Sequence, residues 1–236
     1  MLDNALEALK TFNWGTSLTV VAPIEDAVVA AHDKLDAKRQ LENQLIAALK
    51  GSLSRDAQDY VCRKLAIVGS AASVPTLAVL LIKPENSHMS RFALERIPAP
   101  EASTALRDAL PKVSGSVRIG VINSLGARRD AAAVAALGAL LKDADPATAR
   151  AAALALGSIG TTEAAGILQA SIRVGNGKAT AEPIFDGLLT CAEALLADQK
   201  LSEATAIYSG LNDSKQPRLI RLAATRGLLA CAGRQA

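Results

Sequence analysis

The sequence predicts an all-α protein, a right-handed α-solenoid of about six to seven helical hairpins. Four segments align without a gap, and their leading residues, Leu65, Leu94, Leu125 and Leu156, are 29, 31 and 31 residues apart. Half of the 236 residues are apolar, yet the chain has only one Trp, two Tyr and three Phe, a composition that suits closely packed helices. A single hairpin cannot bury the apolar faces of both its helices, so neighbouring hairpins must stack on one another.

The aligned segments predict two helices joined by a tight turn. They read "LAIVGSAASVPTL" (65–77), "LERIPAPEASTAL" (94–106), "LGARRDAAAVAAL" (125–137) and "LGSIGTTEAAGIL" (156–168). The turn position holds Gly69, Pro98, Arg129 or Gly160. Apolar residues recur three and four positions apart on both sides of it, which indicates one apolar face per helix. Further copies begin at Leu195 and Leu228.

The organisation along the chain follows from this repeat. Residues 1–54 predict an N-terminal cap, with a short helix ending near "TFNWGTS", and a divergent first hairpin with helices over 24–35 and 38–52. Residues 55–173 are the regular repeats. Residues 174–182, within "RVGNGKATAEP", predict an exposed loop insertion. Residues 183–236 are C-terminal repeats, the last of which has a first helix only.

Composition argues against several classes of protein. The net charge of +3 comes from 26 basic and 23 acidic residues without a block of one sign, so a nucleic-acid partner is not indicated. Neither a leader pattern nor an apolar run of 18 residues occurs, so we expect no membrane segment. The three cysteines, Cys62, Cys191 and Cys231, lack a C-x-x-C spacing, and we expect buried thiols in the cytoplasm for the segment as given.

Catalytic and metal-binding residues are not expected. The chain has two histidines, His32 and His88, and neither has a second ligand at i+3 or i+4. We expect both to be ordinary surface or cap residues, with no metal and no cofactor. Phe12 and Trp14 are expected to cap the first hairpin.

Glycines inside predicted helices point to close packing. Each costs about 1 kcal/mol relative to alanine, so a compensating close approach between helices is expected. The positions concerned are Gly120, Gly138, Gly166, Gly187 and Gly227.

The stretch "DPATARAAALALGSIGTTEAAGIL" resembles a HEAT repeat, in the Ala-rich form that overlaps with the PBS-lyase HEAT-like repeats. The strings "VCRKLAIVGSAASVPTLAVLL", "SHMSRFALERIP" and "IGVINSLGARRD" resemble a group of bacterial HEAT-repeat domain-containing proteins of unassigned function. The last complete unit, "CAEALLADQKLSEATAIYSGL", is also similar to a tetratricopeptide repeat. The Arg and Asp ladder of HEAT families is broken, since only Arg118, Arg221 and Asp130 occupy its positions.

This resemblance implies a non-enzymatic protein–protein interaction scaffold or adaptor, with a partner protein or a companion domain of a longer chain. The alternative is a HEAT-like enzyme, a nucleobase glycosylase or a chromophore lyase, that acts through the concave face. An iron hydroxylase of HEAT type is disfavoured because its His-Glu pairs are missing. The last helix predicts an exposed apolar edge, so we expect either that the chain continues in a longer protein or that this C-terminal edge docks on a partner or on a second copy of the chain.

The candidate binding residues come from two places. The second helix of each hairpin is expected to line the concave face, and the position after its closing leucine selects Arg107, Gln169 and Tyr208. Loops contribute Arg128, Arg129 and Lys178. Two guanidinium groups on one turn could clamp a carboxylate or phosphate. The other interpretation is that Asp130 caps the next helix, while Arg128 and Arg129 are solvated or bridge to a neighbouring hairpin.

Overall fold

The structure is a computed structural model that describes residues 1–173 and 178–234, with the side chains of Arg173 and of 178–181 left undescribed. These residues form fourteen α-helices and four short 3₁₀-helices, and no strand occurs among them. The all-α prediction is therefore confirmed. The helices group into two compact units, Met1–Val121 and Ile122–Ala236, and each unit is described by itself.

Unit 1 contains a short cap followed by helical hairpins in the predicted register. Its helices are α1 (Leu2–Ala8), η1 (Leu18–Val20), α2 (Ala22–Ala30), α3 (Leu35–Lys50), α4 (Arg55–Val68), η2 (Ala71–Ser73), α5 (Val74–Leu81), α6 (Pro84–Arg96), α7 (Pro100–Ala109), η3 (Leu110–Lys112) and the first part of α8 (Gly115–Ala127). The hairpin pairs are α2 with α3, α4 with α5, and α6 with α7.

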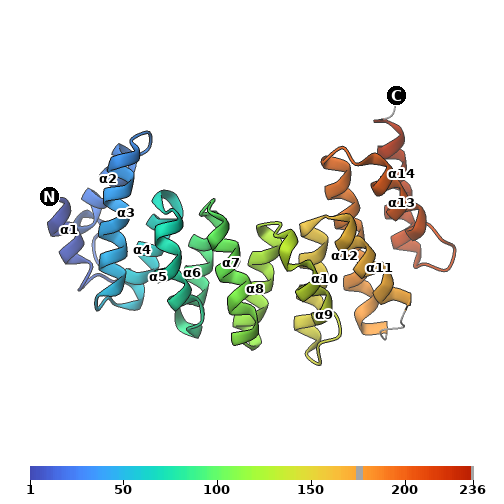
Figure 1. Cartoon of the computed structure of the whole chain (residues 1–236), viewed down its shortest axis with the longest axis horizontal. Helices are drawn as coiled ribbons and strands as arrows, with labels where there is room; N and C mark the ends of the chain where they lie inside the picture. The colour runs from blue at the N-terminus through green and yellow to red at the C-terminus, as the bar shows by residue number, and fades with distance from the viewer. Residues whose placement is uncertain (174–177, 235–236) are drawn as a thin grey trace. The chain divides into compact units, whose positions relative to one another are not determined.

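The hairpins of unit 1 form two layers of helices. The first helices α4 and α6 pack against each other, and the second helices α3, α5 and α7 lie in front of them in Figure 1. Leu65 of α4 and Leu94 of α6 are fully buried, as the repeat register requires. Ser54 starts α4 by accepting a hydrogen bond from the Ala57 amide, and Gly69 ends it.

The N-terminal segment closes the first hairpin with aromatic rings. Phe12 is fully buried, and its ring centroid lies 5.3 Å from that of Tyr60. The Ser54 hydroxyl donates to the Phe12 carbonyl at 2.7 Å, which ties this segment to the start of α4. Trp14 packs edge-on against Phe12 but stays partly exposed. The predicted aromatic cap is therefore confirmed, with Phe12 as its buried part.

Unit 2 repeats the same arrangement and is built around closely packed helices. It comprises the rest of α8, η4 (Ala131–Ala133), α9 (Val134–Leu140), α10 (Pro146–Ile159), α11 (Thr162–Arg173), α12 (Lys178–Ala197), α13 (Leu201–Leu211) and α14 (Arg218–Ala232). Leu125, Leu156 and Leu168 are fully buried. The predicted apolar edge is present on α14, where Leu219, Leu222 and Leu229 are exposed.

Glycines allow the helices to approach closely at most of the predicted positions. A Cβ atom on Gly187 of α12 would lie 2.5 Å from the Ala153 carbonyl oxygen of α10. A Cβ on Gly138 would meet Ile167, one on Gly120 would meet the Arg91 guanidinium, and one on Gly227 would meet the Tyr208 ring, all at distances under 3 Å. Gly166 is the exception, because no described atom lies within 4 Å of its Cβ position.

The structure differs from the sequence analysis at two further places. The exposed loop was predicted over 174–182, but α12 has begun at Lys178; residues 174–177 lie outside the described residues. Pro183 lies inside α12. Asp130 occupies the position before η4, yet its side chain makes no capping hydrogen bond.

Candidate functional site

Two hollows lie in unit 1 where α3 and α5 meet the neighbouring turns. The first hollow, of about 410 Å³, lies beside the N-terminal half of α3. The second hollow, of about 500 Å³, lies beside the C-terminal end of α3. The 3₁₀-helix η2 lies between them, since Ala71 lines the first hollow and Ala72 lines the second. Both volumes fall in the range of ligand and peptide side-chain sites.

The first hollow contains one carboxylate, and both of its oxygens accept hydrogen bonds from other residues of the protein. Glu42 of α3 is 2% exposed and lies among the residues that line the hollow. Its oxygens accept hydrogen bonds from the Ser70 amide at 2.6 Å, the Ser70 hydroxyl at 2.8 Å and the Ser73 hydroxyl at 2.6 Å. Glu42 thus fixes the turn between α4 and α5 against α3. The cations of this hollow are the exposed Arg39 and the half-buried Lys38.

The second hollow carries two cations and no acidic residue. It is lined by Leu49, Lys50, Gly51, Gln58, Ala72, Pro75, Thr76, Val79, Leu80 and Lys83. Lys50 and Lys83 are exposed, and neither ammonium group has a carboxylate within ion-pair distance in the described part of the chain. Both charges are therefore available to an incoming anion.

Local backbone structure places the two lysines at the rim. Lys50 is the last residue of α3, where the helix ends at Gly51 in an extended conformation, and a cation at this end is favoured by the helix dipole. Lys83 immediately precedes Pro84, and a residue before proline is held in extended backbone. Its ψ of 120° fits this restriction and turns the chain sharply between α5 and α6.

Apolar and fixed polar side chains complete the second hollow. Leu49 and Leu80 are buried at its base, whereas Val79 of α5 is 57% exposed. Gln58 is held in place because its amide nitrogen donates to the Leu53 carbonyl and its oxygen accepts from Asn86. The second hollow therefore offers an apolar base, a rigid wall and two positive charges, all from helices that are packed into unit 1.

Comparison with known proteins identifies the repeat. Residues 103–182 match the family of HEAT repeats. In fold, the whole chain is similar to the archaeal HEAT-like repeats protein from Thermococcus onnurineus NA1, with a TM-score of 0.50, 15% sequence identity and coverage of 100% of this chain and 98% of that one. The HEAT resemblance drawn from the sequence is thus confirmed.

Two other solved structures are similar over most of the chain. The complex of CpcE and CpcF of phycocyanin lyase from Nostoc sp. PCC7120 has a TM-score of 0.45 and 18% identity, covering 98% of this chain and 94% of that chain. An engineered protein has a TM-score of 0.43 and 17% identity, covering 89% and 97%. No curated protein matches the chain in sequence. Among the described helices, none has the length and apolar character needed to span a membrane.

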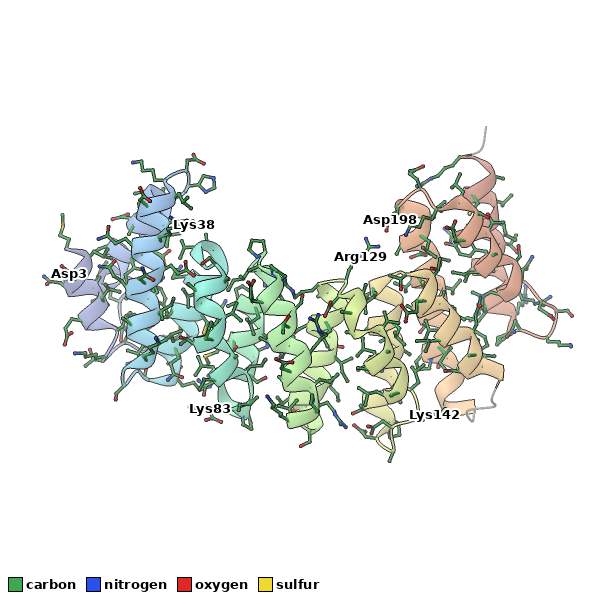
Figure 2. The ribbon with its side chains drawn as sticks, in the orientation of Figure 1. Asp3, Lys38, Lys83, Arg129, Lys142 and Asp198 are labelled. Atoms are coloured by element: carbon green, nitrogen blue, oxygen red, sulfur yellow. The ribbon has the colours of Figure 1, made fainter. Side chains whose placement is uncertain are left out.

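Arg129, one of the residues selected from the sequence, lies at the turn of a HEAT hairpin and is already engaged. Its backbone adopts a left-handed conformation with φ of 51°, and its amide donates to the Gly126 carbonyl. Its guanidinium donates to the Ile159 carbonyl at 3.3 Å and pairs with Asp198 at 2.7 and 3.4 Å (Figure 2). Arg129 therefore bridges turns of successive hairpins, as the second interpretation of the sequence proposed.

The other selected residues do not gather into one described site. Arg107 of α7 donates to Thr104 on its own helix at 3.0 Å, and Gln169 of α11 is half-buried. Arg128 adjoins Arg129 in the same turn. Lys178 is the first residue of α12, and its side chain lies outside the described residues. Their binding role remains a prediction.

Tyr208 was expected to be accessible on the concave face, and this prediction is wrong, because the residue is 3% exposed. Its ring packs on Gly227 of α14, and burial raises the pKa of its hydroxyl to about 12.

Titratable and metal-binding side chains form no second centre in the described part of the chain. No group of three His, Cys, Asp or Glu side chains there could hold a metal ion. The three cysteines are free and buried, as predicted. Burial raises the pKa of Cys62 to about 12 and that of Cys191 to about 11, so both stay protonated at neutral pH and are weak nucleophiles.

Sequence reasoning missed the cations of the two hollows, namely Lys38, Arg39, Lys50 and Lys83. The method selected one position per hairpin, directly after the closing leucine. The informative signal was a lysine at the C-terminal end of each of two successive second helices. "LKGS" at the end of α3 and "VLLIKP" at the end of α5 carry it.

Proposed function

We propose that this chain is a non-enzymatic protein-interaction scaffold that holds a partner protein on its second helices. The observation that carries the proposal is the second hollow, which combines an exposed Val79 with unpaired Lys50 and Lys83. Interfaces between proteins combine an apolar centre with a polar rim in the same way. The partner is either another protein or a companion domain of a longer chain.

Two further features support this function. Helical repeat proteins present extended surfaces formed by successive hairpins, and such surfaces suit protein partners. The three cysteines are free and buried, and Cys62 and Cys191 are protonated at neutral pH; this supports a role without covalent catalysis and a reducing, cytoplasmic location.

Site-specific photo-cross-linking in the source organism tests the proposal. A photoreactive amino acid replaces Val79 on the second helix α5 in one variant and Ile67 on the first helix α4 in a matched control. The two side chains are 57% and 55% exposed, so their general reactivity is comparable. We expect a discrete protein adduct from position 79 and none from position 67. If position 79 gives no discrete adduct, or position 67 gives the same one, the proposal is wrong.

A further inference from the structure

We infer that the second hollow binds an acidic segment of a partner protein, with one apolar side chain against Val79 and flanking carboxylates on Lys50 and Lys83. This inference rests on the proposed function and specifies the chemistry of the partner. It depends on three properties of the hollow: its charge, its apolar base and its lack of aromatic rings.

Charge complementarity selects an anionic partner. Two of the ten lining residues are cations, and none is acidic. The carboxylate of Glu85, two residues after Lys83, belongs to an exposed residue outside this lining, and the Glu85 carbonyl accepts from Arg55 at 3.2 Å. A cationic segment would meet two like charges here, whereas an acidic one would place its carboxylates on both.

The apolar base distinguishes a peptide from a small anion. Two exposed ammonium groups alone hold an anion weakly, since water and salt screen them. The exposed Val79 presents apolar surface in the same lining as both lysines, and Leu49 and Leu80 of that lining are buried. A segment that carries leucine or a similar residue between its carboxylates would cover this surface and bring both charges into contact at once.

The lining favours a polypeptide over a nucleic acid. Single-stranded nucleic acids bind to proteins through a track of cations with exposed aromatic rings for base stacking. The second hollow has no aromatic residue in its lining. A strand of nucleic acid would therefore gain only the phosphate contacts of two lysines.

Fluorescence anisotropy with the purified chain tests this inference. The probe is a fluorescein-labelled peptide Glu-Glu-Leu-Glu-Glu-Leu-Glu; controls are its glutamine counterpart, a peptide with serine in place of leucine, and labelled single-stranded DNA. We expect saturable binding of the first peptide. The glutamine peptide lacks the carboxylates that would contact the lysines, so we expect it to bind at least tenfold more weakly, a difference of roughly 1.4 kcal/mol in binding free energy. Equal binding of the glutamine peptide, or tighter binding of the DNA, overturns the inference.

Two variants locate the binding on the second hollow. The double variant Lys50→Glu/Lys83→Glu reverses the charge of its rim. Lys142→Glu is the matched control, because Lys142 is also an exposed lysine between a second helix and the following first helix, α9 and α10 (Figure 2). We expect the double variant to lose at least tenfold in affinity and the Lys142 variant to match the original chain. Equal affinities of the two variants, with helical circular dichroism retained, contradict the inference.

The two experiments fail independently. If position 79 cross-links a partner whose contacting segment is not acidic, the scaffold function stands and the acidic specificity is wrong. If the acidic peptide binds but no partner is cross-linked, the chemistry of the hollow stands and the proposed function is wrong.

Discussion

Arg129 and Asp198 form an ion pair between residues that lie 69 positions apart, with their closest nitrogen and oxygen 2.7 Å apart. Arg129 follows α8 and Asp198 follows α12, so the pair joins the turns on either side of the turn at Gly160. A terminal nitrogen of Arg129 also lies close to Gly160. Both side chains are partly exposed, and the pair therefore aligns successive turns more than it stabilises the fold.

This pair predicts a measurable shift in the titration of Asp198. The hydrogen bond from Arg129 holds the pKa of the Asp198 carboxyl below its usual range. A lowered pKa in the folded state means that the pair stabilises the fold above the pKa of the unfolded chain, about 3.9, and loses that contribution as pH falls through the folded value. We expect carboxyl-detected NMR to show a depressed Asp198 pKa that rises in Arg129→Gln. An unchanged pKa in that variant would show that Arg129 does not cause the shift.

Replacing the two turn residues of positive φ with glycine is expected to give gains in stability of different size. Gln199 has φ of 62° and Arg129 has φ of 51°, and a left-handed conformation costs a non-glycine residue roughly 1–2 kcal/mol. Gln199→Gly is expected to stabilise the protein by about 1 kcal/mol in urea unfolding. Arg129→Gly relieves the same strain but removes the pair with Asp198, so its gain is expected to be smaller. A larger gain from Arg129→Gly would contradict a stabilising role for the pair.

Two glycines of unit 2 test the close approach of helices. In Gly187→Ala the new methyl group would lie 2.5 Å from the Ala153 carbonyl oxygen, so we expect a loss of about 1–3 kcal/mol in the free energy of unfolding. Gly166→Ala meets no described atom within 4 Å and replaces a glycine inside α11, so we expect a gain of about 1 kcal/mol. Thermal and urea unfolding measure both. Equal effects of the two substitutions would show that the spacing between α10 and α12 does not depend on glycine.

The substitution Glu42→Gln tests whether the hydrogen bonds from Ser70 and Ser73 to Glu42 stabilise the protein. Glu42→Gln keeps the shape of the side chain but replaces one acceptor oxygen with an amide group that cannot accept from Ser70 or Ser73. A buried donor left without an acceptor costs about 1–3 kcal/mol, and we expect destabilisation of this size in urea unfolding. Lys38→Gln on the same helix is the control and should have an effect within about 0.5 kcal/mol. Indistinguishable stabilities of the two variants would mean that the hydrogen bonds to Glu42 contribute nothing.

Part of this architecture could be predicted from the sequence because it repeats. Leu65, Leu94, Leu125 and Leu156 are all fully buried, since each occupies the same place in a hairpin whose spacing hardly varies. The tight turns were also predictable, and Gly160, at one of the predicted turn positions, ends α10 in a left-handed conformation. The sequence pattern predicts the buried leucines and the turns because each hairpin must bury the same face against its neighbours.

Contacts between distant side chains could not be predicted in this way. Glu42 lies 28 residues before Ser70, and its charge on an amphipathic helix indicates an exposed residue rather than a buried one. The spacing of Arg129 from Asp198 depends on how two intervening turns pack. Tyr208 is covered by α14, a helix that begins ten residues later, although its position in the repeat indicated an open face. Each case depends on packing between hairpins rather than within one.

Hydrogen–deuterium exchange with the Glu-Glu-Leu-Glu-Glu-Leu-Glu peptide tests most directly where a partner binds. We expect slower exchange in α5 and at the C-terminal end of α3 when the peptide is added, and unchanged exchange in α9, the corresponding second helix that precedes Lys142. Protection confined to unit 2, or no protection at saturating peptide, would contradict the assignment of the second hollow as the surface that recognises a partner.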